Sequence, residues 1–457
     1  MALGSRTIVA AIAVGGVAAI AAFAYPKANQ LAGLGSAYKA KMTCSELFVA
    51  GHDVEAIEAR EFAGLSAGID QVKTKVDPST RTVTASLMGL GRATAVHRDD
   101  YGCTLVAEGA PAALPDIAPV ADAPWPIAAP DRVDADAVEA ILRAAIAAPE
   151  EKHLAIAAFV DGGFIAEAYA DGIDAATPLL SWSMAKSVTA AMVGVAVHKG
   201  LIDIDARPPI DDWATADDPR GAITWRDLLQ MQSGLSFGEI YGEAGSDATV
   251  MLFDARSAAA VAVAKQTIAA PGEVWSYSSG TTNILQHALR LVLEDAGLDY
   301  HRFARDELFA PLGAASALLE PDSAGDFIGS SFMYATARDW AKFGQLHLQD
   351  GIWNGERLLP EGWVEFVRTP AGQSDKQYGA QFWLNYAGAD GRPQFAKGLP
   401  EEAYVMAGHE GQYVMIVPDK NMVLVRMGRN RAKPGIDAAA PVFAKVYEAT
   451  KKPTPAP

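Results

Sequence analysis

The sequence predicts an α/β protein of the α+β kind, in which an antiparallel sheet is flanked by N- and C-terminal helices and joined to a helical subdomain. Two pairs of apolar runs are separated by short turns, Asp161-Gly162-Gly163 and Pro418-Asp419-Lys420-Asn421, and predict hairpins. Amphipathic helical patterns precede the first pair and follow the second. Helices at both ends of a hairpin-rich domain favour an antiparallel sheet that is covered by helices.

The predicted elements of this domain follow one another with clear start and stop signals. Asp134 is placed to cap the first helix, and Gly200 is a stop signal for the long helix in the middle. In chain order, the elements are a helix from Asp134 through Ile146, strands over Leu154–Val160 and Phe164–Tyr169, helices over Ala185–His198 and from Asn283 onward, strands over Tyr413–Val417 and Met422–Met427, and a closing helix over Ile436–Tyr447.

The N-terminus predicts export. Arg6 is followed by an uncharged run, Thr7–Tyr25, whose length lies between a signal-peptide core and a membrane span. Ala22-Phe23-Ala24 fits the small-x-small cleavage pattern. We therefore expect residues 1–24 to be a signal peptide, or residues 7–25 to be retained as an inner-membrane anchor, with the rest of the chain in the periplasm.

Residues 25–108 predict a small leading segment with strands over Thr82–Leu87 and near Cys103–Val106. The chain has two cysteines, Cys44 and Cys103, which would pair in an oxidising compartment and stabilise by roughly 4 kcal/mol; two unpaired buried cysteines are the alternative. Residues 109–131 are a Pro/Ala-rich linker to the main domain, residues 132–450, and residues 451–457 are a loose tail.

Composition excludes several function classes. The formal net charge is −17, which repels phosphate backbones and argues against nucleic acid as a partner. Two cysteines and scattered histidines build no metal site, and no glycine-rich phosphate loop with its lysine is present. We therefore expect a protein without cofactor or metal that acts on a small molecule.

Ser183-Met184-Ala185-Lys186 opens the long helix and carries a specific chemical logic. Residues three apart share a helical face, so Lys186 can approach the Ser183 hydroxyl. Serine is a weak nucleophile that needs a base, and a partly desolvated lysine can lose its proton and serve as one. The helix N-terminus also offers unpaired N–H groups to an oxyanion.

The tetrad alone is a weak signal. Ser36-Ala37-Tyr38-Lys39 has the same spacing, but it lies beside the leader and we interpret it as a chance match. Two G-x-S-x-G sequences, centred on Ser66 and Ser236, lack the strand-turn-helix context of a nucleophile elbow and are also interpreted as chance.

Two further motifs follow the Ser183 tetrad along the chain. Tyr277-Ser278-Ser279 comes after Pro271–Ser276 (PGEVWS), and His409-Glu410-Gly411 precedes the last hairpin. With these motifs the chain resembles the class C β-lactamase, esterase and 6-aminohexanoate-oligomer hydrolase branch of the penicillin-recognising enzymes, a family of β-lactamase-related serine hydrolases. The similarity covers roughly residues 134–447 and includes the phrases LLQMQSGL, YATARDW and YGAQFW.

The resemblance implies a β-lactamase/transpeptidase-like fold and a role for each matching residue. Ser183 would form an acyl-enzyme, Lys186 would be base or proton relay, and Tyr277 would be the partner general base and acid. Ser279 would line the second motif. A tyrosine hydroxyl beside a lysine cation is also expected to have a lowered pKa.

The third motif is expected to form one wall of the cleft, through His409, Gly411 and the following strand. The Gln412 N–H would complete the oxyanion hole with that of Ser183. Tyr241, in a loop of composition FGEIYGEAGSD, is a candidate to close over the substrate; a plain surface aromatic is the alternative.

Two departures from the family pattern bear on the substrate. His409 stands where β-lactamases carry a lysine that helps to bind the substrate carboxylate, and Glu410 adds negative charge. Ser279 replaces an asparagine that could orient an acyl side chain. The sequence thus predicts an exported serine hydrolase of esters or amides. The rivals are a β-lactamase or D-Ala-D-Ala peptidase, and an idle envelope protein that binds or senses; natural substrate and oligomeric state are left open.

Overall fold

The computed structural model describes residues 4–123, 130–241, 243, 245–388, 394–431 and 434–451, and of residues 4–24 only the backbone. The chain divides into two compact units. The first comprises Met1–His97, Cys103–Pro111 and Ile240–Arg256, and the second comprises Arg98–Gly102, Ala112–Glu239 and Ser257–Pro457.

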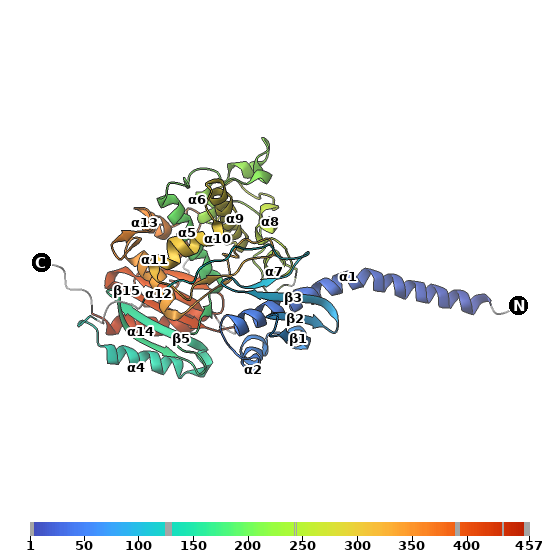
Figure 1. Cartoon of the computed structure of the whole chain (residues 1–457), viewed down its shortest axis with the longest axis horizontal. Helices are drawn as coiled ribbons and strands as arrows, with labels where there is room; N and C mark the ends of the chain where they lie inside the picture. Colours follow the sequence, from blue (N-terminus) through green and yellow to red (C-terminus); the bar gives the residue numbers. More distant parts are fainter. Residues whose placement is uncertain are drawn as a thin grey trace. The chain divides into compact units, whose positions relative to one another are not determined.

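The first unit joins a long helix to a four-stranded sheet of order β1-β2-β3-β4 (Figure 1). Cys44 of the helix is bonded to Cys103 of the last strand, with 6.0 Å between their Cα atoms. The disulfide lies in a small apolar core that includes Ala40, Val83 and Ala95. Its elements are α1 (Gly4–Phe48), α2 (Val54–Ile57), the π-helical turn Glu58–Phe62, α3 (Ala67–Gln71), β1 (Val72–Asp77), β2 (Thr82–Leu87), β3 (Leu90–Arg98), β4 (Gly102–Leu105) and α7 (Asp247–Phe253).

In the part of the chain that the structure describes, none of the helices has the length and apolar character needed to cross a membrane. The predicted leader, residues 1–24, falls outside the residues whose side chains are described. Of the predicted linker, residues 124–129 lie outside the described residues, and its described parts, residues 109–123 and 130–131, have no regular secondary structure. The predicted tail, apart from Lys451, also lies outside these ranges.

The second unit is built on a six-stranded sheet of order β12-β13-β14-β15-β5-β6, in which all neighbouring strands are antiparallel. Both predicted hairpins form, and the two hairpins meet where β15 pairs with β5. The strands are β5 (His153–Val160), β6 (Gly163–Tyr169), β12 (Trp383–Leu384), β13 (Tyr404–Gly408), β14 (Gln412–Val417) and β15 (Met422–Gly428).

Helices cover both faces of this sheet, because the strands alternate apolar residues between two cores. Ile156, Ala158 and Val160 of β5 face α4 (Ala135–Ile146) and α14 (Gly435–Ala449), which lie together on one side (Figure 1). The intervening residues, such as Ala157 and Phe159, join the larger core on the other side, with α5 (Ala185–His198), α9 (Ser279–Asp295) and α12 (Ala337–Leu348). This arrangement confirms the predicted fold class.

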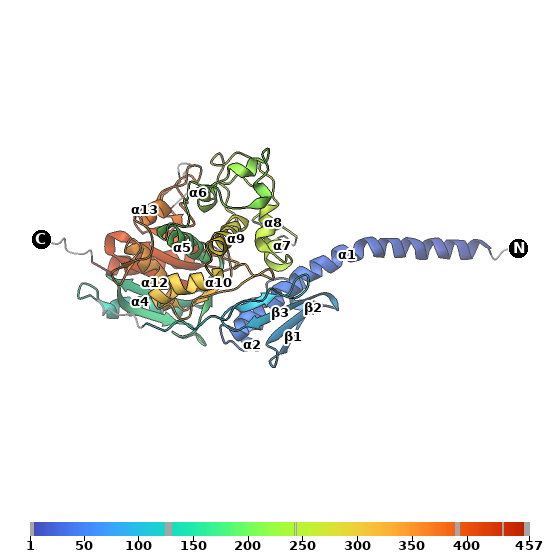
Figure 2. The same cartoon turned by 45° about the horizontal axis from the view of Figure 1, so that its top comes forward.

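The helical part of this unit surrounds α5 and α9, which pack side by side (Figure 2). Its helices are α5 (Ala185–His198), α6 (Trp225–Leu229), α8 (Ala258–Val263), α9 (Ser279–Asp295), α10 (Tyr300–Ala304), α11 (Ala310–Leu312), α12 (Ala337–Leu348) and α13 (Trp363–Arg368). Short strands are β7 (Leu179–Leu180), β8 (Leu318–Leu319), β9 (Met333–Ala335), β10 (Ile352–Trp353) and β11 (Glu356–Arg357). Single turns are Pro149–Glu151, Trp182–Met184, Asp211–Trp213, Pro219–Ala222, Arg305–Phe309 and Pro418–Lys420.

One helix begins earlier than the sequence predicts. We expect a helix from Asn283, whereas α9 already starts at Ser279. Ser278 caps it by accepting a hydrogen bond from Thr281 N at 3.0 Å. The capped first turn, Ser-Gly-Thr-Thr, consists of poor helix formers, and helix propensity therefore does not indicate that α9 begins there. As a result, the second motif lies on the first turn of α9.

Candidate active site

Ser183 lies on the tight turn Trp182–Met184 that leads from β7 into α5. Trp182, just before it, has φ of +46°, a left-handed conformation that a bulky residue rarely adopts. Its carbonyl accepts a hydrogen bond from Ser181 Oγ at 2.8 Å. Such backbone strain is concentrated at functional sites and is held here by the surrounding turn.

Lys186 reaches back from the first turn of α5 to Ser183. Its Nζ lies 3.1 Å from Ser183 Oγ, 2.8 Å from Ser279 Oγ and 2.9 Å from the carbonyl oxygen of Ser330. The side chain is fully buried, and burial lowers the pKa of Lys186 to about 8, although the charge of Glu239 acts in the opposite direction. The lysine is thereby poised to lose its proton near neutral pH.

Ser279 connects this lysine to Glu239, a residue that the sequence gives no reason to select. Glu239 Oε1 accepts from Ser279 Oγ at 2.5 Å, and its other oxygen accepts from Ser279 N at 2.8 Å. Glu239 lies in the loop that follows one of the chance G-x-S-x-G sequences. Forty residues separate it from Ser279, so only the tertiary fold brings the two together.

The aromatic ring of Tyr277 lies 5.0 Å from Lys186 Nζ and packs against Tyr378 and Trp383. Burial, followed by the charge of Glu239, raises the pKa of Tyr277 above its ordinary value, while hydrogen bonds with Ser183 and Trp383 lower it. The expectation of a lowered pKa is therefore wrong, because burial and the charge of Glu239 outweigh the two hydrogen bonds. Tyr277 is consequently a protonated hydroxyl at neutral pH.

The third motif lies against the turn that carries Ser183. His409 packs edge-on against the Trp182 ring at 5.6 Å. A Cβ on Gly408 would come within 2.1 Å of the Ser181 carbonyl oxygen, so only glycine lets β13 approach this closely. Gly411 has φ of +95°, and a Cβ there would collide with Arg426 Nη1.

The negative charge of Glu410 is not exposed to a ligand, contrary to our expectation. Its carboxylate is buried and paired with Arg431 Nε and, at 3.5 Å, with Arg429 Nη1. Burial also lowers the pKa of His409, with the charge of Glu410 opposing the shift. The Gln412 side chain hydrogen-bonds Gly428 N and O, at 3.0 and 2.6 Å, which leaves its predicted oxyanion role to the backbone N–H.

Several other residues singled out in the sequence lie in the first unit. Tyr241 belongs to the first unit and is 37% exposed, so its proposed closure over a substrate stays a prediction. Ser36 and Lys39 lie inside α1, where Lys39 donates to Val72 O and pairs with Glu58. Ser66 caps α3.

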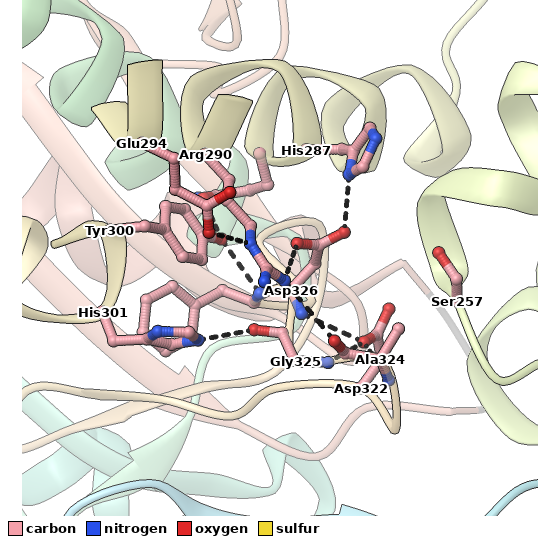
Figure 3. A network of polar contacts seen from close by, with 12 residues as sticks. Ser257, His287, Arg290, Glu294, Tyr300, His301, Asp322, Ala324, Gly325 and Asp326 are labelled. Carbon is pink, nitrogen blue, oxygen red and sulfur yellow. Dashed lines mark hydrogen bonds and ion pairs between the residues drawn. The ribbon is translucent and has the colours of Figure 1, made fainter. Parts of the chain in front are cut away.

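A second polar network holds the turn from Asp322 to Asp326 against α9 (Figure 3). Asp326 pairs with His287 at 2.8 Å and with Arg290 at 3.0 Å, both on α9. Asp322 accepts hydrogen bonds from three N–H groups in its own turn and from one at the start of α8, at 2.9–3.1 Å. Burial raises the pKa of Asp322 to about 6.

Asn283, one turn after Ser279 on α9, bonds Ser330 directly: its side chain donates to Ser330 Oγ at 3.1 Å and accepts from Ser330 N at 3.3 Å. One helix therefore positions two of the three acceptors around Lys186. The sequence places Asn283 at the start of the predicted helix, whereas α9 begins at Ser279, one turn earlier. Only with this earlier start do Ser279 and Asn283 lie one turn apart on the same helix.

The β-lactamase family model matches residues 138–444. The chain belongs to the β-lactamase family. This confirms the resemblance to β-lactamase-related serine hydrolases and the β-lactamase/transpeptidase-like fold. The match covers more than half of the chain and includes Ser183, Tyr277 and His409.

Individual proteins that are similar to this chain share limited sequence identity with it. The 6-aminohexanoate-dimer hydrolase of Paenarthrobacter ureafaciens is 27% identical over an alignment of 218 residues, and the match covers 44% of this chain and 54%, or about half, of that protein. A solved structure from Bacillus anthracis, described as a 6-aminohexanoate-dimer hydrolase, has a TM-score of 0.53 at 22% identity, covering 66% of this chain and 79% of that one. A family VIII carboxylesterase has a TM-score of 0.53 at 17% identity, covering 71% and 99%.

In this β-lactamase-family domain, as in the rest of the described ranges, no group of three or more His, Cys, Asp or Glu side chains could hold a metal ion. A hydroxyl, an amine of lowered pKa and a phenol lie together, which suits nucleophilic attack with proton transfer.

Proposed function

We propose that the chain hydrolyses an ester or amide bond through an acyl-enzyme on Ser183, with Lys186 as general base and Tyr277 as proton donor. The observation that carries this proposal is the 3.1 Å contact between Lys186 Nζ and Ser183 Oγ at a lysine whose pKa is lowered to about 8. A base that titrates near the working pH transfers protons efficiently.

The steps follow from this geometry. Neutral Lys186 takes the Ser183 hydroxyl proton while Oγ attacks the substrate carbonyl carbon, giving a tetrahedral oxyanion. The backbone N–H groups of Ser183 and Gln412 are the proposed donors to that oxygen. Tyr277 then donates its proton to the leaving alcohol or amine and recovers one from Lys186. Water repeats the sequence on the acyl-enzyme and releases the acid.

The substrate we propose is a neutral or amine-bearing ester or amide. A β-lactamase or D-Ala-D-Ala peptidase binds a carboxylate, whereas here the third motif carries His409, whose pKa is lowered by burial, in place of a lysine. Glu239 adds a carboxylate at the second motif. A 6-aminohexanoate-dimer hydrolase and a family VIII carboxylesterase are among the proteins similar to this chain, which supports amide or ester chemistry.

An idle envelope protein that binds or senses a ligand is the rival from another class. The presence of Ser183, Lys186 and Tyr277 in one cluster argues against this rival. Burying a lysine costs free energy, and a site that performs no reaction has no use for that lysine. The cost of desolvating an amine is easier to understand where the neutral amine is used as a base.

We also propose export to the periplasm. The uncharged run Thr7–Tyr25 supports it, and so does the Cys44–Cys103 disulfide, because disulfides persist in oxidising compartments. Mass spectrometry of the N-terminus of the exported protein distinguishes cleavage after Ala24 from a retained anchor. A protein that keeps its cysteines reduced and stays in the cytoplasm contradicts the proposal.

A substrate panel tests the activity. The purified protein and Ser183→Ala are compared on p-nitrophenyl esters, anilides, a chromogenic cephalosporin and a D-Ala-D-Ala peptide. We expect hydrolysis of esters or amides that disappears in the variant. Preference for the cephalosporin or the peptide would replace our proposal by the first rival, and no turnover of any compound would favour the idle protein.

A further inference from the structure

A chain of short hydrogen bonds runs from Lys186 through Ser279 to Glu239. Lys186 Nζ lies 2.8 Å from Ser279 Oγ, and Ser279 Oγ lies 2.5 Å from Glu239 Oε1. The other carboxylate oxygen is 2.8 Å from Ser279 N, so Glu239 accepts hydrogen bonds from both donors of Ser279, its N–H and its hydroxyl. Ser279 and Lys186 are both fully buried, which makes each of these contacts strong in a medium of low dielectric.

The donors and acceptors of Glu239, Ser279 and Lys186 determine the direction of these hydrogen bonds. An ionised carboxylate can only accept, so the hydroxyl proton of Ser279 points toward Glu239. Its oxygen is then available to Lys186 only as an acceptor. The Ser330 carbonyl, 2.9 Å from Nζ, is likewise an acceptor only. A neutral amine has two N–H bonds and one electron pair, and the two acceptors engage both N–H bonds.

The third direction around Nζ is occupied by Ser183 Oγ, at 3.1 Å. We propose that Glu239 is a positioning residue that fixes the Ser279 hydroxyl as an acceptor and thereby aims the electron pair of neutral Lys186 at Ser183. The inference rests on the proposed function, in which Lys186 is the base. Glu239 itself gains and loses no proton in the reaction.

Without the carboxylate, the Ser279 hydroxyl is free to rotate and donate its proton to the Lys186 electron pair. That bond competes with the Ser183 hydroxyl for the base. The charged and titratable groups around these hydrogen bonds are Lys186, Glu239, Tyr277 and Tyr378. The charge of Glu239 shifts the pKa of each of the other three. Its charge raises the pKa of Lys186 against the opposing effect of burial.

Glu239→Gln tests the inference because the amide has one acceptor oxygen instead of two. The Ser279 N–H can only donate, so the amide oxygen turns to it and the NH2 group faces Ser279 Oγ. The hydroxyl is then released toward Lys186. We expect kcat/KM to fall by about 10- to 100-fold, within the range that proton transfer contributes. The acidic limb of the pH profile also moves to lower pH, because loss of the charge lowers the pKa of Lys186 further.

A double-mutant comparison shows whether Glu239 acts through Ser279. In a Ser279→Ala background we expect Glu239→Gln to cost less than threefold. The matched control is Glu273→Gln, an exposed glutamate in the PGEVWS phrase before the same motif, which should leave rate and pH profile unchanged. If Glu239→Gln does not fold, as judged by circular dichroism, Glu239→Ala takes its place, since it also frees the hydroxyl.

The inference is overturned if Glu239→Gln keeps the wild-type rate, if its acidic limb stays in place, or if it costs the same factor with and without Ser279. The proposed function fails differently. In that case Ser183→Ala retains activity, whereas failure of the inference alone leaves the wild type active and Ser183→Ala inactive.

Discussion

Lys186 Nζ lies 3.1 Å from Ser183 Oγ, close enough for the amine to exchange a proton with the hydroxyl. The pair forms because three residues separate them at the start of α5, where side chains one turn apart share a face. Burial then makes the lysine lose its proton more easily than usual, because it lowers the pKa of Lys186 to about 8. Local spacing and tertiary burial are both required.

Replacing Lys186 by methionine should reduce kcat/KM by about 10²- to 10⁴-fold, the range that a general base contributes. Methionine keeps much of the volume and removes the buried amine, so the fold should survive, as thermal unfolding can show. Lys199→Met, at an exposed lysine paired with Glu307, is the matched control and should keep full activity. An active Lys186→Met enzyme would exclude the lysine as base.

The pH profile of kcat/KM should rise with pH, with its midpoint near pH 8, and level off about one pH unit above it. Lys186 acts only when neutral, so activity is lost as the pH falls below its lowered pKa of about 8. The pKa of Tyr277 is raised, so its deprotonation should cause no loss of activity up to pH 10. A profile with its acidic midpoint below pH 6 would contradict the assignment of the base.

Tyr277→Phe should lower kcat/KM by about 10²-fold or more, because the leaving group then departs without a positioned acid. The phenyl ring preserves the packing against Tyr378 and Trp383, and so stability should change by less than about 1 kcal/mol. The acidic limb should stay where it is in the wild type, since Lys186 is still present. Esters with good leaving groups should suffer least, and equal losses for all leaving groups would speak against Tyr277 as the acid.

Gly408→Ala should disturb the turn that carries Ser183. Its Cβ would meet the Ser181 carbonyl oxygen at 2.1 Å, and a backbone atom cannot move aside cheaply. We expect a loss of about 1–3 kcal/mol in the free energy of unfolding, measured with urea, together with reduced activity. Gly68→Ala is the control, because the nearest atom to its Cβ is 3.8 Å away. Unchanged stability of Gly408→Ala would show that β13 and the turn are not held together as described.

Replacing Cys44 and Cys103 by serine should destabilise the first unit by about 4 kcal/mol, since the disulfide closes a segment of 59 residues. Protease resistance of the first unit, compared before and after substitution, measures the effect. The kinetic constants of the second unit should change little. A variant as resistant as the wild type would mean that the other packing of α1 on the sheet is sufficient.

The sequence predicted those parts of the fold whose signals are local. The hairpin turns at Asp161–Gly163 and Pro418–Asn421, the cap at Asp134 and the stop at Gly200 all lie where they were expected, because each depends on a few neighbouring residues. The tetrad, the second motif and the third motif were also identified, and the structure brings them together around Ser183.

What the sequence did not predict depends on contacts between distant segments. Glu239 meets Ser279 across the fold, and no spacing rule links the two. The pKa of Tyr277 was expected in the wrong direction because burial and Glu239 were unknown. The sequence also predicts negative charge at Glu410, whereas Arg429 and Arg431, on the segment after β15, pair with this carboxylate.

The most direct test is to locate the nucleophile by mass spectrometry after treatment with a fluorophosphonate probe. We predict a single adduct on Ser183, absent from Ser183→Ala and undiminished in Ser36→Ala, which alters the other Ser-x-x-Lys sequence. An adduct on a different serine, or labelling that persists in Ser183→Ala, would contradict the account.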